Sequence, residues 1–105
     1  MAYSVIIKTV KPADKAWWGP QTANITKSRS IRTVTESTAG LISSSAGQSP
    51  SDANVWVVHQ LWESQAAFEA YAAALETNVH YQERNAYGTA NNFVTTRYHG
   101  AVTLA

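Results

Sequence analysis

Histidines and one arginine carry most of the chemistry that this sequence offers. His80 lies nine residues after Tyr71, and a neutral imidazole near pH 7 can act as a base or bind a metal or haem. The competing interpretation is a surface histidine that pairs with Glu83 or Arg84, three and four residues further along one helix. His80 and Glu83 are the only close pair of metal-ligand residues, and two ligands do not make a site, so we expect no metal.

His59 and Arg97 are the other candidates, each on a predicted strand. His59 lies between Val57 and Leu61. It is either a proton acceptor that reaches into a pocket or a buried histidine hydrogen-bonded to the next strand or to a partner chain. Arg97 shares one face of the last strand with His99. A positioned Arg97 can hold the oxygen of an enolate or phenolate, and the plainer alternative is an ion pair with a carboxylate on a neighbouring strand.

A strand followed directly by a helix must position these groups. Residues 55–62 alternate as a strand, and Ser64 can cap the next helix by accepting a hydrogen bond from a backbone N–H two or three residues on. One strand face carries Val55, Val57, His59 and Leu61, and the other carries Trp56, Val58, Gln60 and Trp62. The helix presents a stripe of Phe68, Tyr71, Ala72 and Leu75. Trp62 therefore walls a pocket and stacks on a flat substrate, or it plugs the strand–helix joint.

The other elements follow from chain breaks and periodicity. A first strand is predicted over 3–10, and a helix over 20–38, where Pro20 opens a stretch that contains no further Pro and no Gly. The stripe of this helix is Ala23, Lys27, Ile31, Val34 and Thr38. A strand over 30–36 is the alternative, but it would leave an uncommonly long unstructured connection. We expect Gly40 to cap the helix. The later elements are a weak strand over 41–47, a polar hairpin loop over 48–54, a helix from Ser64 to Tyr87 with a pause at 77–78, and a strand over 92–104 with a bulge or bend at Gly100.

The element order β-α-β-β-α-β is the split βαβ, or ferredoxin-like, arrangement of an α+β protein. It forms a four-stranded antiparallel sheet with helices on one face only. The chain is long enough for one domain, residues 1–105. Because both faces of strand 55–62 are largely apolar, the face without helices needs another cover. A second copy of the chain is the economical cover, so we expect a homodimer.

Composition excludes several classes of protein. The formal net charge of +1 gives no electrostatic footprint for nucleic acid or an anionic membrane. The absence of cysteine excludes disulfides and thiol nucleophiles. The apolar runs are too short for a signal peptide or a membrane span, so we expect a cytoplasmic protein. Because adjacent Trp17 and Trp18 cannot share one face of an element, we expect one ring to cap a pocket or contact a partner and the other to be half exposed.

The stretch that begins at Trp62, WESQAAFEAY, resembles the antibiotic biosynthesis monooxygenase family of the dimeric α+β barrels. That family has a hydrophobic strand, then W-x-S, then a small residue and an aromatic, then a second aromatic three residues on. Ala39-Gly40-Leu41 is also similar to the family's P-G-aromatic turn into the second strand, with Ala39 in place of Pro. The resemblance implies a homodimer whose two sheets form a barrel, with a pocket between sheet and helices in each subunit.

The resemblance also implies an activity. The best-understood members oxidise phenolic polyketides with dioxygen and use no flavin, haem or metal. They have an Asn and a Tyr where this chain has Val58 and Phe68. A second branch degrades haem with an Asn on the first strand, an aromatic at the Tyr71 position and a histidine near the His80 position. The first strand of this chain has no Asn.

We therefore expect a monooxygenase that acts on a small aromatic or polyketide-type molecule without a cofactor. The expected catalytic residues are His59 or His80 as base and Arg97 for the anion, and the expected substrate-binding residues are Trp62, Tyr71, Trp18 and Phe68. A non-catalytic dimeric module that binds a small molecule or serves assembly is the alternative, and haem binding or degradation comes third.

Overall fold

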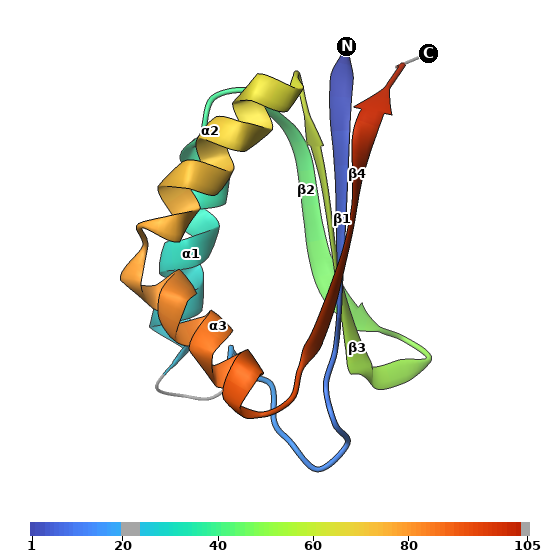
Figure 1. Cartoon of the computed structure of the whole chain (residues 1–105), viewed down its shortest axis with the longest axis vertical. Helices are drawn as coiled ribbons and strands as arrows, with labels where there is room; N and C mark the ends of the chain where they lie inside the picture. The colour runs from blue at the N-terminus through green and yellow to red at the C-terminus, as the bar shows by residue number, and fades with distance from the viewer. Residues whose placement is uncertain (20–23, 104–105) are drawn as a thin grey trace.

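The computed structural model of the chain describes residues 1–19 and 24–103. Its elements in chain order are β1 (Ala2–Val10), α1 (Ile25–Ser37), β2 (Leu41–Ser49), β3 (Asp52–Trp62), α2 (Gln65–Glu76), α3 (Val79–Ala90) and β4 (Val94–Val102). The strands form one antiparallel sheet in the order β2-β3-β1-β4, and the helices cover one of its faces (Figure 1). This confirms the ferredoxin-like α+β fold. The predicted helix positions Pro20 and Ala23, and the predicted strand end at Leu104, lie outside the described residues.

The two central strands hold the sheet in an unbroken register. β1 pairs with β3 from Tyr3 opposite Trp62 to Val10 opposite Val55, and it pairs with β4 without interruption. Gly100 lies directly opposite Ser4 in that ladder, so the predicted bulge at Gly100 is wrong. The irregularities fall on the edge strand β2, between Leu41 and Ser43 and between Gln48 and Ser49.

The hairpin between β2 and β3 is tighter than predicted. Residues 48–54 are not a loop, because β2 continues to Ser49 and β3 starts again at Asp52. The Ser51 backbone N–H donates to Ser49 Oγ at 3.4 Å, and the Asn54 N–H donates to an Asp52 carboxylate oxygen at 2.9 Å. Short polar side chains thus satisfy the backbone of the turn, and an edge hairpin facing solvent tolerates their polarity.

The helix α1 forms within residues 20–38, where the sequence favoured a helix over a strand at 30–36. It ends at Ser37 with Thr38 as its C-cap, so Gly40 is not the cap itself. Gly40 instead turns the chain into β2 with φ +92°, a conformation that favours glycine. A Cβ atom at Gly40 would also lie 2.7 Å from the Ala67 Cβ, so the close approach of this turn to α2 requires glycine.

The joint after β3 forms as predicted, and the following helix divides in two. The Ala67 N–H donates to Ser64 Oγ at 3.1 Å, which caps α2. At the predicted pause, Asn78 Oδ1 accepts from the N–H groups of His80 and Tyr81, both at 3.0 Å. This cap starts α3 as a separate helix, which then runs past Gly88 to Ala90.

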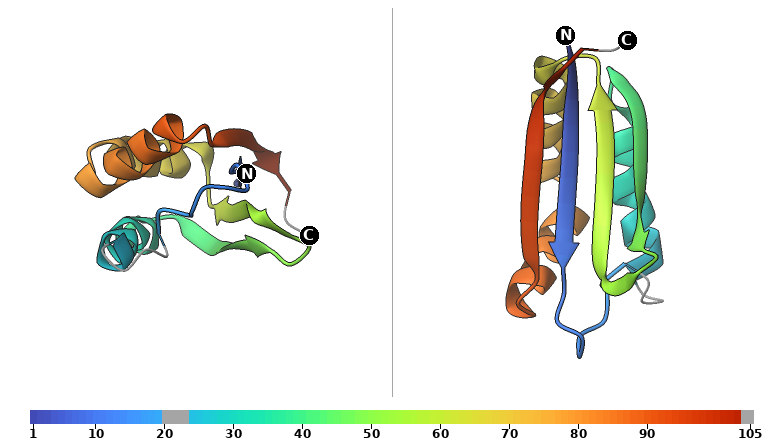
Figure 2. Two further views of the ribbon diagram at one scale, coloured as in Figure 1. Left: turned by 90° about the horizontal axis from the view of Figure 1, so that it is seen from below. Right: turned by 90° about the vertical axis from the view of Figure 1, so that its right-hand side faces the viewer.

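The two faces of the sheet differ sharply in burial. On the face toward the helices, Val5 and Trp62 are fully buried, and Tyr3, Tyr71 and Phe68 pack around them. The opposite face, seen in front of the helices in Figure 2 (right), carries exposed apolar side chains. These are Ile6, Val10, Val57, Val94 and Tyr98, with Tyr98 59% exposed and Val94 62% exposed. In the described part of the chain, no helix is long and apolar enough to cross a membrane.

Candidate functional site

An open cleft of about 1220 Å³ lies between the three helices and the covered face of the sheet. It exceeds the roughly 300–1000 Å³ of most small-molecule pockets, so a molecule of several fused rings fits within it. Of the residues predicted to bind substrate, Trp18, Phe68 and Tyr71 line this cleft. Trp62 does not line it: its side chain is fully buried behind Tyr71, with the two ring centroids 4.8 Å apart.

A chain of buried hydrogen bonds runs from Trp62 to the cleft wall. The indole N–H of Trp62 can only donate, and it donates to Oε1 of Gln60 at 3.2 Å. The amide of Gln60 must therefore present its NH₂ group on the other side, where Nε2 donates to the Tyr71 hydroxyl at 3.3 Å. The hydroxyl of Thr35, on α1, lies 2.9 Å from the same Tyr71 oxygen. The alternation of β3 brings this about, since it puts Gln60 and Trp62 on one face of the strand as predicted, and that face turns out to be the one toward the helices.

This network gives the Tyr71 hydroxyl a defined chemical role. A phenolic oxygen can accept two hydrogen bonds and donate one. When Gln60 and Thr35 both donate to it, the Tyr71 proton is available to a molecule in the cleft. In the described chain, every buried side-chain polar atom has at least one hydrogen-bond partner. Trp62 thus acts through Gln60 to hold the Tyr71 hydroxyl on the cleft wall.

Arg97 and two further arginines, Arg32 and Arg84, line the same cleft. Arg97 lies opposite Ile7 in the β1–β4 ladder, and both residues line the cleft. Arg84 reaches the cleft from α3, with its guanidinium 5.2 Å from the centre of the Tyr81 ring. Partial desolvation by the surrounding side chains lowers the pKa of Arg84, and the charge of Arg97 lowers it further, while Tyr81 and Tyr71 raise it.

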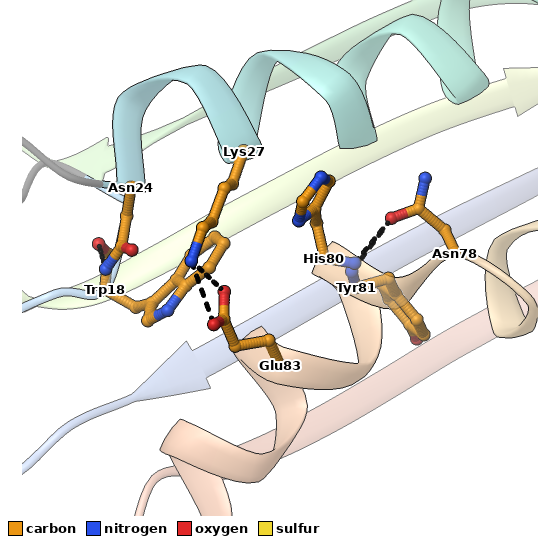
Figure 3. A network of polar contacts seen from close by, with 7 residues as sticks. All are labelled: Trp18, Asn24, Lys27, Asn78, His80, Tyr81 and Glu83. Carbon is orange, nitrogen blue, oxygen red and sulfur yellow. Dashed lines mark hydrogen bonds and ion pairs between the residues drawn. The ribbon is translucent and has the colours of Figure 1, made fainter.

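The adjacent tryptophans close one end of the cleft from two directions. Trp18 is buried, and its backbone carbonyl accepts a hydrogen bond from Asn24 Nδ2 at 3.0 Å (Figure 3). Trp17 turns toward the sheet, where its indole N–H donates to the Ala53 carbonyl at 3.0 Å and its ring packs on Trp56. Both rings line the cleft, and Trp17 is the half-exposed one, as predicted for one member of the pair.

None of the three histidines, all of which fall within the described residues, lines the cleft. His59 is on the uncovered sheet face, where Nε2 lies 3.4 Å from the Ser4 hydroxyl. His80 lies on α3 close to α1, beside the ion pair between Lys27 and Glu83 at 2.9 Å (Figure 3). Glu83 therefore pairs across the helices with Lys27. His99 faces the helices, with Nδ1 3.2 Å from the Tyr3 hydroxyl and its ring against Phe68.

Sequence reasoning missed three cleft residues: Gln60, Thr35 and Arg84. Gln60 carried a usable signal, because a polar side chain that shares the helix-facing side of a strand with Trp62 must find a partner there. Arg84 carried none, since the direction of its side chain depends on the helix break at Asn78. Within residues 1–19 and 24–103, no three His, Asp or Glu side chains gather as metal ligands would.

Comparison with known proteins identifies the family. The family model described as antibiotic biosynthesis monooxygenase matches residues 21–83, more than half of the 105-residue chain. A comparison with curated proteins finds no match. Among solved structures, a variant of SnoaB, a cofactor-independent oxygenase from Streptomyces nogalater, is 9% identical with a TM-score of 0.68, over 99% of this chain and 95% of that one. Rv0793 from Mycobacterium tuberculosis is 16% identical with a TM-score of 0.64, over 100% and 99%.

At such low identity, the structural likeness establishes the fold alone. The family model's match, residues 21–83, includes Trp62 and Ser64, the joint that holds the hydrogen-bonded cleft wall. The chain belongs to the antibiotic biosynthesis monooxygenase family.

Proposed function

We propose that this protein is a monooxygenase that oxidises a small aromatic or polyketide-type molecule in the cleft with dioxygen and no bound cofactor. One observation carries the proposal: an amide and a phenol meet on the cleft wall, where Gln60 donates to Tyr71. The family resemblance implies such a pair, and Val58 and Phe68 leave its usual positions without one. Gln60 and Tyr71 supply the same groups two residues further along β3 and three further along α2.

The reaction that fits is oxidation of an activated CH₂ group, as in an anthrone. The substrate loses a proton to become an enolate, and the enolate passes electrons to dioxygen as a carbon–oxygen bond forms. The resulting hydroperoxide loses water when its O–O bond breaks and the second C–H proton leaves. One oxygen atom ends in the new ketone and the other in water, and all four electrons come from the substrate. No external reductant is therefore needed.

The residues of the cleft divide this work. Arg97 stabilises the enolate oxygen by its charge, and the Tyr71 hydroxyl donates to the oxygen that carries charge after dioxygen adds. Phe68 and Trp18 pack on the rings of the substrate and exclude water from the reacting carbon. Trp62 positions Tyr71 through Gln60 and does not contact the substrate.

No histidine in the described part of the chain lines the cleft to accept the proton of the substrate. His59 and His80 stay predictions as bases, since neither contributes to the cleft lining. A substrate acidic enough to ionise beside two arginines needs a weaker base, because nearby positive charge favours its anion. We therefore propose that the cleft selects the anion rather than generating it with a dedicated histidine.

Oxygen uptake with a panel of anthrones and hydroquinones tests the function. The wild-type protein should consume oxygen well above the buffer rate, and Tyr71→Phe should lower kcat by about 100-fold or more, as loss of one positioned donor does. Tyr98→Phe is the matched control, because this phenol is exposed on the uncovered face. No uptake above buffer with any substrate, or equal rates for Y71F and Y98F, would contradict the proposal.

A non-catalytic binding module is the second candidate. The observation that favours it is the absence of histidine from the lining of the cleft, which removes the usual base. The same panel separates the two functions. A binding module would bind anthrones and the corresponding quinones with similar affinity and would consume no oxygen.

Haem binding has less support than either. It would draw on Tyr71 and His80, and His80 is not among the residues that line the cleft. A haemin titration tests it directly. A Soret shift with one-to-one stoichiometry that is lost in His80→Ala would favour haem over the monooxygenase proposal.

We also propose that the protein is a cytoplasmic homodimer that associates through the uncovered sheet face. Support comes from the exposed apolar side chains there, at the centre of which Ile6 lies opposite His59 and Tyr98. Large apolar patches on a small domain mark association surfaces. Sedimentation at micromolar concentration tests this, and a stable single chain would contradict it.

A further inference from the structure

Three arginines line the cleft: Arg32 on α1, Arg84 on α3 and Arg97 on β4. Arg84 and Arg97 form a pair in which the charge of Arg97 acts on Arg84. In the part of the chain that the structure describes, the one ion pair is Lys27 with Glu83, so neither member of this pair has a carboxylate within 4.0 Å. Two like charges held near each other without a counter-ion repel, and this repulsion is stronger where protein replaces water.

The surroundings of Arg84 leave its hydrogen-bond donors free for a ligand. Its guanidinium lies 5.2 Å from the centre of the Tyr81 ring, and the face of a planar cation is the part that packs on a ring. The N–H groups point outward in the plane of the guanidinium and can donate two parallel hydrogen bonds to a carboxylate. No side-chain hydrogen bond from Arg84 or Arg97 to another described residue competes with such a ligand.

We propose that Arg84 and Arg97 together bind an anionic oxygen of the substrate, either a carboxylate or an ionised phenol or enol on a planar ring system. This inference rests on the proposed function, because it takes the cleft as the substrate site. It names the substrate class as an aromatic acid. The carboxylates that also line the cleft, Glu36 and Glu76, disfavour an anion near them and so direct it toward the arginine pair.

The arginine pair also explains how a cleft without histidine can work. Opposite charge within a few ångströms lowers the pKa of an acidic group by about 1–3 units. Binding beside two guanidinium groups would therefore ionise a phenol or enol whose pKa in solution lies about 1–3 units above the working pH. The Tyr71 hydroxyl, 3.3 Å from the Gln60 amide, is then placed to donate to the same anion or to reduced oxygen.

Non-oxidisable quinones test this binding apart from turnover. Anthraquinone-2-carboxylate and its neutral carboxamide are titrated against quenching of tryptophan fluorescence, since Trp18 lines the cleft. We expect the carboxylate to bind about 10-fold or more tightly than the amide, with Arg84→Gln and Arg97→Gln each removing most of that preference. Equal affinity for the two ligands rules out carboxylates as the occupants of the pair, and a preference that survives both substitutions overturns the proposal.

Alizarin distinguishes the second source of negative charge, because its ionised phenol changes colour. We expect its pKa to fall by about 1 unit or more on binding the wild-type protein, and by less in R84Q and R97Q. If the protein prefers the carboxylate over the carboxamide but does not shift the pKa of alizarin, the arginine pair binds carboxylates. If it shifts the pKa of alizarin but shows no such preference, the pair binds phenolates. If it does neither, the pair is not an anion site.

Matched variants guard against misfolding and separate this inference from the proposed function. Arg29→Gln removes a guanidinium from α1 outside the cleft lining and should leave all affinities unchanged. Arg84→Lys and Arg97→Lys keep the charge and should restore part of the preference. Because the probes consume no oxygen, a retained anion preference without oxygen uptake contradicts only the monooxygenase. Oxygen uptake without any anion preference contradicts only the arginine pair.

Discussion

The two faces of one sheet contrast most clearly in β3, where His59 and Gln60 are neighbours in sequence and point in opposite directions. Gln60 is 3% exposed and is bonded to both Trp62 and Tyr71. His59 is exposed and has one long contact, 3.4 Å to Ser4. Buried polar groups need hydrogen-bond partners, and each of those on the covered face has one. On the uncovered face, apolar side chains are exposed to solvent in the single chain.

This contrast separates two tasks. The covered face holds the groups that can act on a ligand, namely Tyr71, Arg97 and the residues behind them. The uncovered face offers apolar area and little chemistry, which suits association with a second copy. The predictions below challenge this division, beginning with the substitution expected to cost most.

Trp62→Ala should cause the largest loss of stability. The side chain is fully buried between the sheet and α2, and removing a buried tryptophan typically costs about 3–5 kcal/mol. It also leaves Oε1 of Gln60 without its donor. Urea unfolding at fixed protein concentration measures the change. Trp17→Ala is the control, since that ring is half exposed at the end of the cleft, and an equal loss would contradict the central role of Trp62.

Ile6→Lys should separate association from folding. In a symmetric dimer the substitution places two ammonium groups in one apolar interface, which should weaken dimerisation by about 100-fold or more. The monomer should keep its circular dichroism, because Ile6 is already 37% exposed in the single chain. Val79→Lys is the matched control on the surface of α3, where Val79 is 66% exposed, and it should sediment as wild type. Equal sedimentation of both variants would contradict an interface on the sheet.

Local sequence signals explain why much of this division was predictable. The alternation of β3 gives its two faces, and Ser64 gives the start of α2, because both depend on neighbours within a few residues. The β2–β3 hairpin was predicted with too long a loop, because the polar residues 48–54 resemble a loop although strand ends at an edge hairpin accept them. His80 and Arg84 could not be assigned to a surface, because the cap at Asn78 starts a new helix and resets which residues face the cleft.

Gln60→Leu should have a smaller effect than Trp62→Ala and should act on the covered face alone. It removes the donor to Tyr71 and the acceptor for Trp62, so a buried indole N–H loses its partner at a cost of about 1–3 kcal/mol. Gln60→Glu keeps an acceptor for Trp62 but loses the donor to Tyr71. A carboxylate at position 60 would accept the Tyr71 proton, whereas leucine leaves that proton for the ligand. If the Tyr71 proton serves the ligand, Q60E should therefore reduce kcat and leave KM nearly unchanged, and Q60L should reduce kcat less. Oxygen-uptake kinetics measure both constants, and identical kinetic effects of Q60L and Q60E would contradict this role.

The smallest effects come from a matched pair of histidines, and they bear directly on which face does chemistry. His99→Leu removes the partner of the Tyr3 hydroxyl, which is 9% exposed, and should cost about 1 kcal/mol in urea unfolding. His59→Leu replaces an exposed side chain and should change the free energy of unfolding by no more than about 0.5 kcal/mol.

Oxygen-uptake rates test whether a histidine on either surface takes part in the reaction. His59→Leu and His80→Leu should keep the wild-type rate, because neither side chain reaches the cleft within one chain. A partner chain could change this only for His59, since the proposed interface covers its face of the sheet and leaves α3 outside. Loss of activity in H59L but not in H80L would therefore assign the base to the dimer interface and end the separation of chemistry from association.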